Sequence, residues 1–199
     1  MRSFFFRIEL DGPARVLRLA SPDGTNRLTR ACVLALTAAI ADLKDEPKQP
    51  PHPLIIAGNR QFFSVGADLN EIAALSGPAA YEFSALGQAL MNAIASRPAP
   101  VIAAIEGHCM GGGLDLALAC HRRIAAPHAV LAHRGAALGL ITGWGGTQRL
   151  PRLIGKSRAL ELLIAAEKIS AARALGIGLV DAIADDPVAE AMRQLRIGT

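Results

Sequence analysis

Two short runs of apolar residues, each closed by a glycine turn, constrain the fold of this chain most strongly. Leu54–Ala57 stops at Gly58, and Val101–Ile105 is followed closely by Gly107. Strands that are buried on both faces of a parallel sheet have this continuous apolar character. A long helical pattern over 78–96 separates the two runs, and strand–helix–strand alternation is typical of stacked βαβ units. The sequence therefore predicts an α/β fold.

The rest of the chain fits a single α/β domain. Alternating residues on both sides of the turn Asp11-Gly12-Pro13 predict a β-hairpin. Apolar residues at helical spacing predict a helix that starts at Thr29 and ends near Leu43. The expected elements are strands over 4–10 and 15–20, a helix over 29–43, a surface connection over 45–53, strands over 122–126 and 179–183, and mainly helical structure from residue 145 onward.

The composition excludes several other classes of protein. Apolar residues make up 51% of the 199 residues and charged residues 19%, which excludes a disordered chain and a coiled coil. The net charge of +4 comes without a block of Lys and Arg interleaved with aromatic residues, so nucleic-acid binding is not expected. The apolar runs end well short of the roughly 20 residues that a membrane span requires, so no membrane span is expected.

The first apolar stretch and the cysteines bear on the compartment of the protein. The stretch that begins at Phe4 is interrupted by Arg7, which is too early for a signal peptide. The cysteines, Cys32, Cys109 and Cys120, have no metal-ligand spacing, and their odd number argues against a disulfide framework. We therefore expect a cytoplasmic protein without a metal site.

Two turns place backbone amides where the apolar strands end, and they are Phe62–Leu69 and Gly107–Leu116. The second turn contains the triple glycine Gly111–Gly113. A helix that opens on glycines presents free N–H groups at the positive end of its dipole. Such a helix start can hold a phosphate or an oxyanion that forms on a carbonyl group. Close packing of the helix is the alternative explanation for these glycines.

The common nucleotide-binding fingerprints do not fit the second turn. Its glycines are not spaced as G-x-G-x-x-G, and no Lys-Ser or Lys-Thr pair follows them as in a P-loop. We therefore do not expect a nucleotide gripped by its phosphates at this turn.

Motifs spread over nearly the whole chain carry a more specific signal. They are Asn26-Arg27-Leu28, Phe63-Ser64-Val65-Gly66-Ala67-Asp68-Leu69, the run from Pro100 through the triple glycine, Gly143-Trp144-Gly145-Gly146-Thr147-Gln148-Arg149-Leu150-Pro151, and Ile169-Ser170-Ala171 with Gly178-Leu179-Val180-Asp181. In order and spacing the sequence resembles the enoyl-CoA hydratase/isomerase (crotonase) family. The resemblance implies a crotonase-like spiral of ββα turns.

The resemblance also implies how the chain is divided. The crotonase-like, acyl-CoA-binding core would cover 1–183, and a short C-terminal helix would cover 184–199, truncated relative to the family. The family usually continues into a helical segment that closes the acyl pocket. A helix from Pro187 or a neighbouring subunit would then close it here, and the family resemblance implies a homotrimer or hexamer.

What the resemblance implies for the ligand is an acyl-CoA thioester, with coenzyme A as part of the substrate and no tightly bound cofactor. The backbone amides of Ser64 and Gly112 would polarise the thioester carbonyl and stabilise an enolate. The Ser64 hydroxyl need not be a nucleophile, because no G-x-S-x-G elbow surrounds it. The residues expected to bind the ligand are Phe63, Ser64, Val65, Gly66, Ala67 and Gly112.

The acid–base positions depart from the family pattern. Asp115 stands where family hydratases have their first glutamate, so the resemblance implies that it moves a proton; by itself, an Asp in a first helical turn is also a common dipole partner. Gly135 stands where the second glutamate is expected. The nearby His133 could act as an acid or base near pH 7, or it is a polar loop residue or a subunit contact.

The resemblance implies an enoyl-CoA hydratase or a double-bond isomerase. Isomerisation needs fewer acid–base roles than hydration, which favours an isomerase when one carboxylate is missing. The alternatives are a variant like dihydroxynaphthoyl-CoA synthase, a thioester-hydrolysing variant, and a non-catalytic acyl-CoA-binding paralogue.

Overall fold

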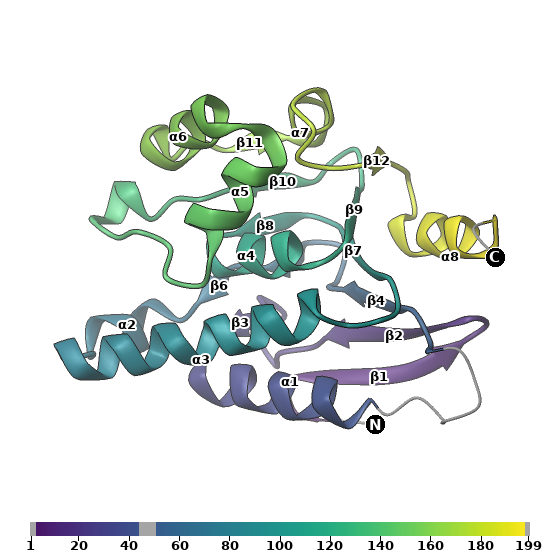
Figure 1. Ribbon diagram of the computed structural model, residues 1–199, viewed down its shortest axis with the longest axis horizontal. Helices are drawn as coiled ribbons and strands as arrows, with labels where there is room; N and C mark the ends of the chain where they lie inside the picture. The colour runs from purple at the N-terminus through teal and green to yellow at the C-terminus, as the bar shows by residue number, and fades with distance from the viewer. Residues whose placement is uncertain (1–2, 44–50, 198–199) are drawn as a thin grey trace.

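The chain winds through successive turns of strand, strand and helix, which confirms the predicted spiral of ββα turns (Figure 1). The computed structural model describes residues 3–43 and 51–197, so most of the connection expected over 45–53 lies outside the described residues. The first such turn contains β4 (Leu54–Ala57), β5 (Phe62–Ser64), β6 (Gly66–Ala67), α2 (Leu69–Ala73) and α3 (Gly77–Ala95). The next contain β7 (Val101–Ile105), β8 (His108–Met110) and α4 (Gly112–Ala119), and then β9 (Arg122–Ala125), β10 (Val130–Ala132), the short 3₁₀ helix η1 (Ala136–Leu138) and α5 (Gly146–Ile154).

Each of these turns gives its first strand to a six-stranded sheet and its second strand to a four-stranded sheet. The larger sheet has the order β1-β2-β4-β7-β9-β12 and the smaller one β11-β10-β8-β5. All pairs in the larger sheet are parallel except β1 with β2, which form the predicted hairpin. The remaining strands are β1 (Phe6–Asp11), β2 (Ala14–Leu19), β3 (Arg27–Leu28), β11 (Ile169–Ser170) and β12 (Ala182–Ile183), and β3 pairs with β6.

The central strands β4 and β7 of the larger sheet are buried on both faces, which explains their continuous apolar runs. Ile56 and Ala103 belong to the main core, to which α3 and α1 (Arg30–Asp42) contribute. Thr29, the expected start of this helix, is the N-cap of α1 and accepts a hydrogen bond from an amide of its first turn. Ile55 and Ile102 point the other way, into a second apolar cluster with residues of the C-terminal helix α8 (Pro187–Ile197).

The C-terminal part is mainly helical, as expected, with α5, α6 (Lys156–Ala165), α7 (Ala171–Gly176) and α8. The strand expected over 179–183 is wrong in its first half, because only Ala182–Ile183 is a strand. The amides of Leu179 and Val180 instead donate to Ala174 O in the turn after α7. Alternation of apolar residues cannot separate such a buried turn from a strand.

Helix α8 packs against the sheet through Ala191 and Met192, on the face opposite α1 and α3. The expectation that this helix closes an acyl pocket therefore does not hold within one chain, because no residue of α8 lines the cavity described below. The domain boundary at residue 183 stays a prediction. Among the residues described, no helix combines the length and the apolar character needed to cross a bilayer.

Candidate functional site

The two glycine-containing turns meet backbone to backbone. Ser64 ends β5, Gly112 is the first residue of α4, and Gly66 lies between them with a φ of +91°. A Cβ atom on Gly66 would lie 2.6 Å from Met110 O and 2.8 Å from Gly112 N, and one on Gly113 would lie 2.6 Å from Ser64 O. Only glycine permits this approach, so the glycines place the end of β5 against the N-terminus of α4.

Hydrogen bonds with Asn26 hold the turn that carries Ser64. The Asn26 side chain donates to Phe62 O at 2.9 Å and to Phe63 O at 3.2 Å. The Ser64 hydroxyl donates to Asn26 O at 2.7 Å and accepts from Gly66 N at 3.1 Å. This hydroxyl is completely buried and engaged on both sides, so it positions the backbone and is not free to attack a substrate.

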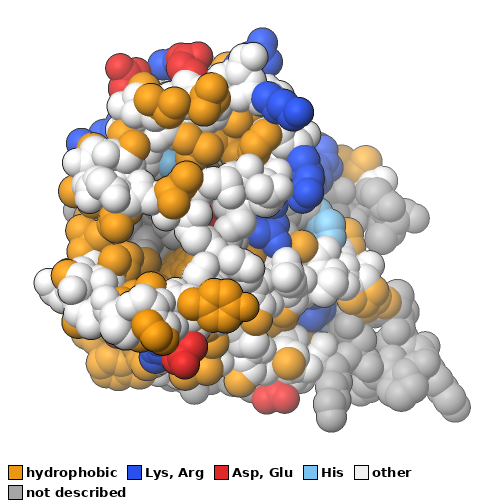
Figure 2. Space-filling view, turned by 60° about the vertical axis from the view of Figure 1, so that its left-hand side comes forward, with side chains coloured by type: hydrophobic (Ala, Val, Ile, Leu, Met, Phe, Trp, Pro, Cys, Tyr) orange, Lys and Arg blue, Asp and Glu red, His pale blue; other side chains and the backbone are white. Residues whose placement is uncertain are grey.

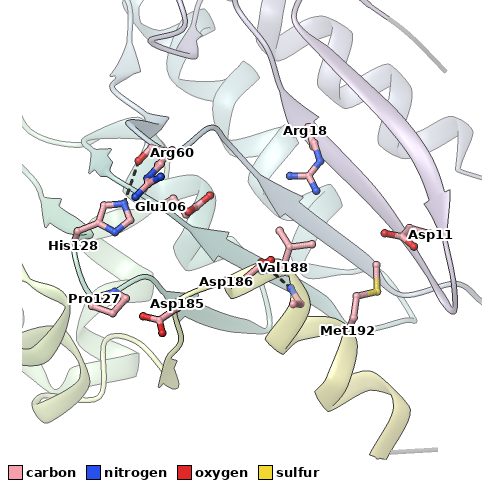
Figure 3. Close-up of a pocket in the computed structure, with 11 residues that line it drawn as sticks. Asp11, Arg18, Arg60, Glu106, Pro127, His128, Asp185, Asp186, Val188 and Met192 are labelled. Atoms are coloured by element: carbon pink, nitrogen blue, oxygen red, sulfur yellow. Dashed lines mark hydrogen bonds between the residues drawn. The ribbon is translucent and has the colours of Figure 1, made fainter.

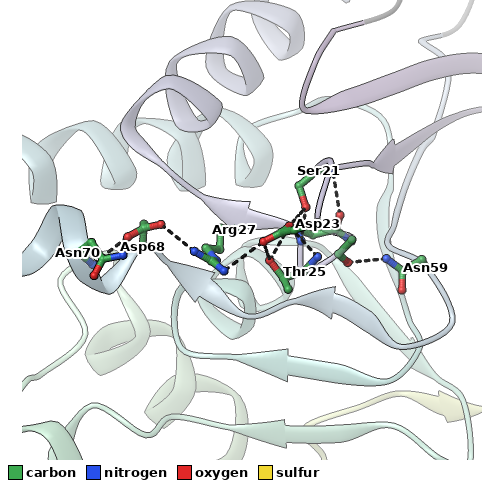
Figure 4. A network of polar contacts seen from close by, with 9 residues as sticks. Ser21, Asp23, Thr25, Arg27, Asn59, Asp68 and Asn70 are labelled. Atoms are coloured by element: carbon green, nitrogen blue, oxygen red, sulfur yellow. Dashed lines mark hydrogen bonds and ion pairs between the residues drawn. The ribbon is translucent and has the colours of Figure 1, made fainter.

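An exposed polar network runs from Ser21 to the start of α2 (Figure 4). Arg27 lies 3.1 Å from a carboxylate oxygen of Asp23 and 3.3 Å from one of Asp68, and Asp68 caps α2. Hydrogen bonds from Ser21 and Thr25 lower the pKa of Asp23 to about 2. Exposed ion pairs contribute little stability, so we assign this network no role in the site.

Asp115 lies in the first turn of α4, in the same helical turn as the Gly112 amide, and its exposed fraction is 2%. Its Oδ2 accepts a hydrogen bond from Thr142 Oγ1 at 2.5 Å. Its Oδ1 lies 3.2 Å from His133 Nε2, and both of these buried atoms lack a hydrogen-bond partner among the described residues. A carboxylate and an imidazole that face each other with unused hydrogen-bonding capacity are equipped to exchange protons with a ligand.

His133 is therefore not a surface loop residue. It follows β10 directly, it is buried with an exposed fraction of 5%, and it faces Asp115. Gly146 forms the wall behind the pair, because a Cβ atom there would meet Asp115 Oδ1 and lie 2.8 Å from both His133 Nε2 and Thr142 Cγ2. The structure thus brings together the two titratable residues named from the sequence, and it adds Thr142 and Gly146.

Gly135 lies in the loop that follows His133. Its carbonyl oxygen accepts hydrogen bonds from Leu138 N and Leu140 N, which close the loop around η1. A Cβ atom on Gly135 would lie 2.8 Å from Leu140 O, a backbone atom that cannot easily move. This loop conformation therefore requires a residue without a side chain at position 135.

A cavity of about 400 Å³ joins these features. Gly111, Gly112, Asp115, His133 and Gly135 line it on one side. Its other walls are mostly apolar and come from α2, the first half of α3 and the loop 138–144, with Ser84 and Thr142 as polar members, and Arg134 lines it too. Figure 2 shows this side of the molecule, where hydrophobic side chains gather around a hollow. Among the described residues that line the cavity, Asp115 is the one that carries a carboxylate.

The residues predicted to bind the ligand fall into two groups. Val65 and Ala67 line the cavity. Phe63 and Ser64 are completely buried behind it, and Gly66 is buried against α4, so these residues reach a ligand through backbone atoms at most. Trp144, which sequence reasoning did not single out, also lines the cavity.

A second cavity, of about 740 Å³, lies on the α8 side of the larger sheet (Figure 3). Arg18, Arg60 and His128 line it together with Asp11 and Glu106, and two further carboxylates come from the residues just before α8. The carboxylates offset the cationic side chains, so the cavity does not attract a polyanion. None of the site residues predicted from the sequence lies there.

Comparison with known proteins gives consistent relatives. Residues 14–196 match the family model described as "Enoyl-CoA hydratase/isomerase". A "Probable enoyl-CoA hydratase" of Bacillus subtilis (strain 168) is 50% identical over 137 residues, which cover 67% of this chain and 52% of the relative. The matched part thus spans about half of that relative's length. The "Crotonyl-CoA hydratase" of Syntrophomonas wolfei is 39% identical over 177 residues, or 88% of this chain and 67% of the relative.

Solved structures share the fold over almost the entire chain. The enoyl-CoA hydratase of Bacillus anthracis superposes with a TM-score of 0.87 at 32% identity, over 97% of this chain and 74% of that one. The enoyl-CoA hydratase of Thermoplasma volcanium gives a TM-score of 0.89 at 31% identity, over 98% and 77% of the two chains.

Proposed function

Because this chain belongs to the enoyl-CoA hydratase/isomerase family, we propose that it hydrates an enoyl-CoA or shifts its double bond through a thioester enolate. One observation carries the proposal. The buried Asp115 lies in the first turn of the helix whose N-terminal amide, that of Gly112, meets the Ser64 turn in an apolar cavity. Donors for an oxyanion and a group that can move a proton are thus within one helical turn of each other.

The amides of Ser64 and Gly112 form the oxyanion hole in this proposal. The N–H of Gly112 is in the first helical turn, where no intrahelical acceptor is available. The helix dipole adds positive potential at the same point. In a dry apolar cavity such a donor typically contributes about 2.7–4 kcal/mol to the stability of an oxyanion.

Proton transfer falls to Asp115, with His133 as its neighbour. Thr142 fixes one carboxylate oxygen, so the other oxygen is directed toward His133 and the cavity. Neutral histidine can accept or donate a proton near pH 7. The buried contact between the two titratable groups favours an enzyme over a non-catalytic acyl-CoA-binding paralogue, because an unused buried carboxylate would be costly to retain.

The ligand in this proposal is an acyl-CoA thioester, and no tightly bound cofactor is needed. The thioester carbonyl oxygen is the atom that the two amides would recognise. Binding should therefore weaken when that oxygen is absent.

We expect S-butyl-CoA, a thioether without the carbonyl oxygen, to bind at least about fivefold more weakly than butyryl-CoA. Two hydrogen bonds are lost, each worth at least about 0.5 kcal/mol. Isothermal titration calorimetry of both compounds, with free CoA as the reference, measures the difference. Equal affinities for the thioester and the thioether would remove the oxyanion-hole assignment.

We also propose that the chain forms a homotrimer or hexamer. Leu138 and Ile141 of the loop around η1 and Leu160 and Ile164 of α6 are large, apolar and mostly exposed in the single chain. Apolar surface of this kind marks contacts between subunits. Light scattering should give three or six times the chain mass of 20.8 kDa. A molar mass equal to that of one chain at micromolar concentration would contradict the proposal.

A further inference from the structure

The indole of Trp144 lies behind the N-terminus of α4 and ties it to α3. Its exposed fraction is 4%, and Nε1 donates a hydrogen bond to Phe83 O at 3.2 Å. The rings of Trp144 and Phe83 are 5.3 Å apart between centroids, so the indole is packed as well as hydrogen-bonded. A buried tryptophan usually has such a partner for its N–H group.

Two glycines make room for this indole at opposite edges of the ring system. A Cβ atom on Gly87 would overlap Trp144 Nε1 and Cδ1. A Cβ atom on Gly112 would lie 2.5 Å from Trp144 Cζ3 and 2.8 Å from Cε3. The pyrrole edge therefore contacts the middle of α3, and the benzene edge contacts the first residue of α4.

The contact with the indole explains why a glycine stands in the middle of α3. Gly87 is buried within the 19-residue helix α3, where glycine is about 1 kcal/mol less favourable than alanine. The close approach of the indole requires the missing side chain. Gly87, Trp144 and Gly112 thus form one packed unit across two helices.

The same contact restricts the backbone of Gly112. The preceding Gly111 has a φ of +50° and no side-chain cap, so α4 starts without a local hydrogen bond that would fix its first amide. The same Cβ atom on Gly112 would also lie 3.2 Å from Ala67 N in β6. Gly112 is therefore packed against both the β6 turn and the benzene edge of Trp144 where a side chain would otherwise stand.

We infer that Trp144 is a positioning residue for the oxyanion hole: its indole holds the Gly112 amide in the direction needed to stabilise a thioester enolate. The inference rests on the proposed function and extends it to a residue that need not touch the reacting atoms. A smaller side chain would leave a void continuous with the cavity, into which water and the Gly112 backbone could move. Pre-organised donors lose their advantage when they can reorient.

Acetoacetyl-CoA tests this inference, because its enolate has an ultraviolet absorbance that the keto form lacks. We expect the wild-type protein to raise the enolate-to-keto ratio of the bound compound at fixed pH, the α-proton being released to the buffer. Trp144→Ala should lower this ratio at least about tenfold, since loss of an oxyanion donor costs about 10²–10³-fold. The KM for an enoyl-CoA substrate should change much less than kcat.

Two variants separate positioning from general packing. Trp144→Phe keeps an aromatic wall against Gly112 and should retain the ratio within about threefold, because the donor stays in place. Tyr81→Ala removes an exposed aromatic side chain from α3, the helix against which Trp144 packs, and should leave the enolate-to-keto ratio unchanged. A wild-type ratio in Trp144→Ala would overturn the inference, as would equal losses in the Phe and Ala variants.

A measurement on the unaltered protein avoids any dependence on folding of the variants. Trp144 is the one tryptophan in the sequence, so its fluorescence reports on this wall alone. We expect butyryl-CoA to change the emission, and free CoA to change it much less. An unchanged emission at saturating butyryl-CoA would overturn the inference. Failure of the wild-type protein to bind butyryl-CoA or acetoacetyl-CoA at all would instead remove the proposed function, and this inference with it.

Discussion

Replacement of Asp115 by asparagine is expected to lower the turnover of crotonyl-CoA at least about a hundredfold, since a positioned acid or base contributes about 10²–10⁴-fold. Asparagine has the same shape and can still accept the hydrogen bond from Thr142 Oγ1. It cannot accept or release a proton, so kcat should fall while the affinity for butyryl-CoA is nearly kept. Steady-state assays that follow loss of the conjugated thioester, together with calorimetry, measure both quantities.

The matched comparison is His133→Ala, which we expect to be less damaging than Asp115→Asn. The reason is that Asp115 lies in the first turn of α4, beside the Gly112 amide. His133 instead follows β10 and faces the Asp115 carboxylate, with its Nε2 3.2 Å from Oδ1. If His133→Ala lowers turnover more than Asp115→Asn, the histidine is the principal proton carrier. If neither substitution changes a turnover that the wild-type protein shows, Asp115 and His133 do not carry the proton; if the wild-type protein turns over no acyl-CoA, it is a non-catalytic acyl-CoA-binding paralogue.

Gly146→Ala should lower turnover by about a hundredfold although residue 146 carries no chemistry, because a misplacement of about 1 Å can cost 10²-fold. The added Cβ atom would meet Asp115 Oδ1 and lie 2.8 Å from His133 Nε2, so the pair must move. Alanine is the best helix former, and residue 146 begins α5, so the helix itself should tolerate the change. Turnover and the melting temperature should be measured on the same preparation.

Gly176→Ala is the control for this substitution. It also adds one methyl group at a helix end, but the position is open, with no atom within 4 Å of the new Cβ. We expect wild-type turnover from this variant. Wild-type turnover from Gly146→Ala as well would show that the Asp115–His133 geometry is not needed for the reaction.

Much of the fold could be predicted from local patterns. The runs Leu54–Ala57 and Val101–Ile105 are apolar throughout because both faces of their sheet are covered, and this pattern predicts buried parallel strands without any partner being known. The strands of the smaller sheet could not be predicted in this way. β5, β8 and β10 have three residues each, which is too short for any period in the sequence.

In the candidate site, too, some residues could be predicted from the sequence and others could not. Asp115 and Gly112 could be named because they stand in or just after the triple glycine, at positions to which the family resemblance assigns roles. The contacts of Thr142, Trp144 and Gly146 depend on how α5 docks against α3 and α4. The two residues of the Thr142–Asp115 bond are 27 positions apart in the sequence, and those of the Trp144–Phe83 bond are 61 apart. Trp144 and Gly146 stand in the motif Gly143–Pro151, but the motif does not show which side chains they contact. His133 was open to opposite interpretations for the same reason, until its burial beside Asp115 was known.

The central claim is that this chain stabilises a thioester enolate while Asp115 moves the α-proton. Exchange of the α-protons of butyryl-CoA with deuterium oxide, followed by proton NMR, tests it without any assumption about the natural substrate. We predict that the wild-type protein accelerates this exchange and that Asp115→Asn lowers the rate at least about a hundredfold. Butyryl-CoA that binds to saturation without any protein-dependent exchange would contradict the claim.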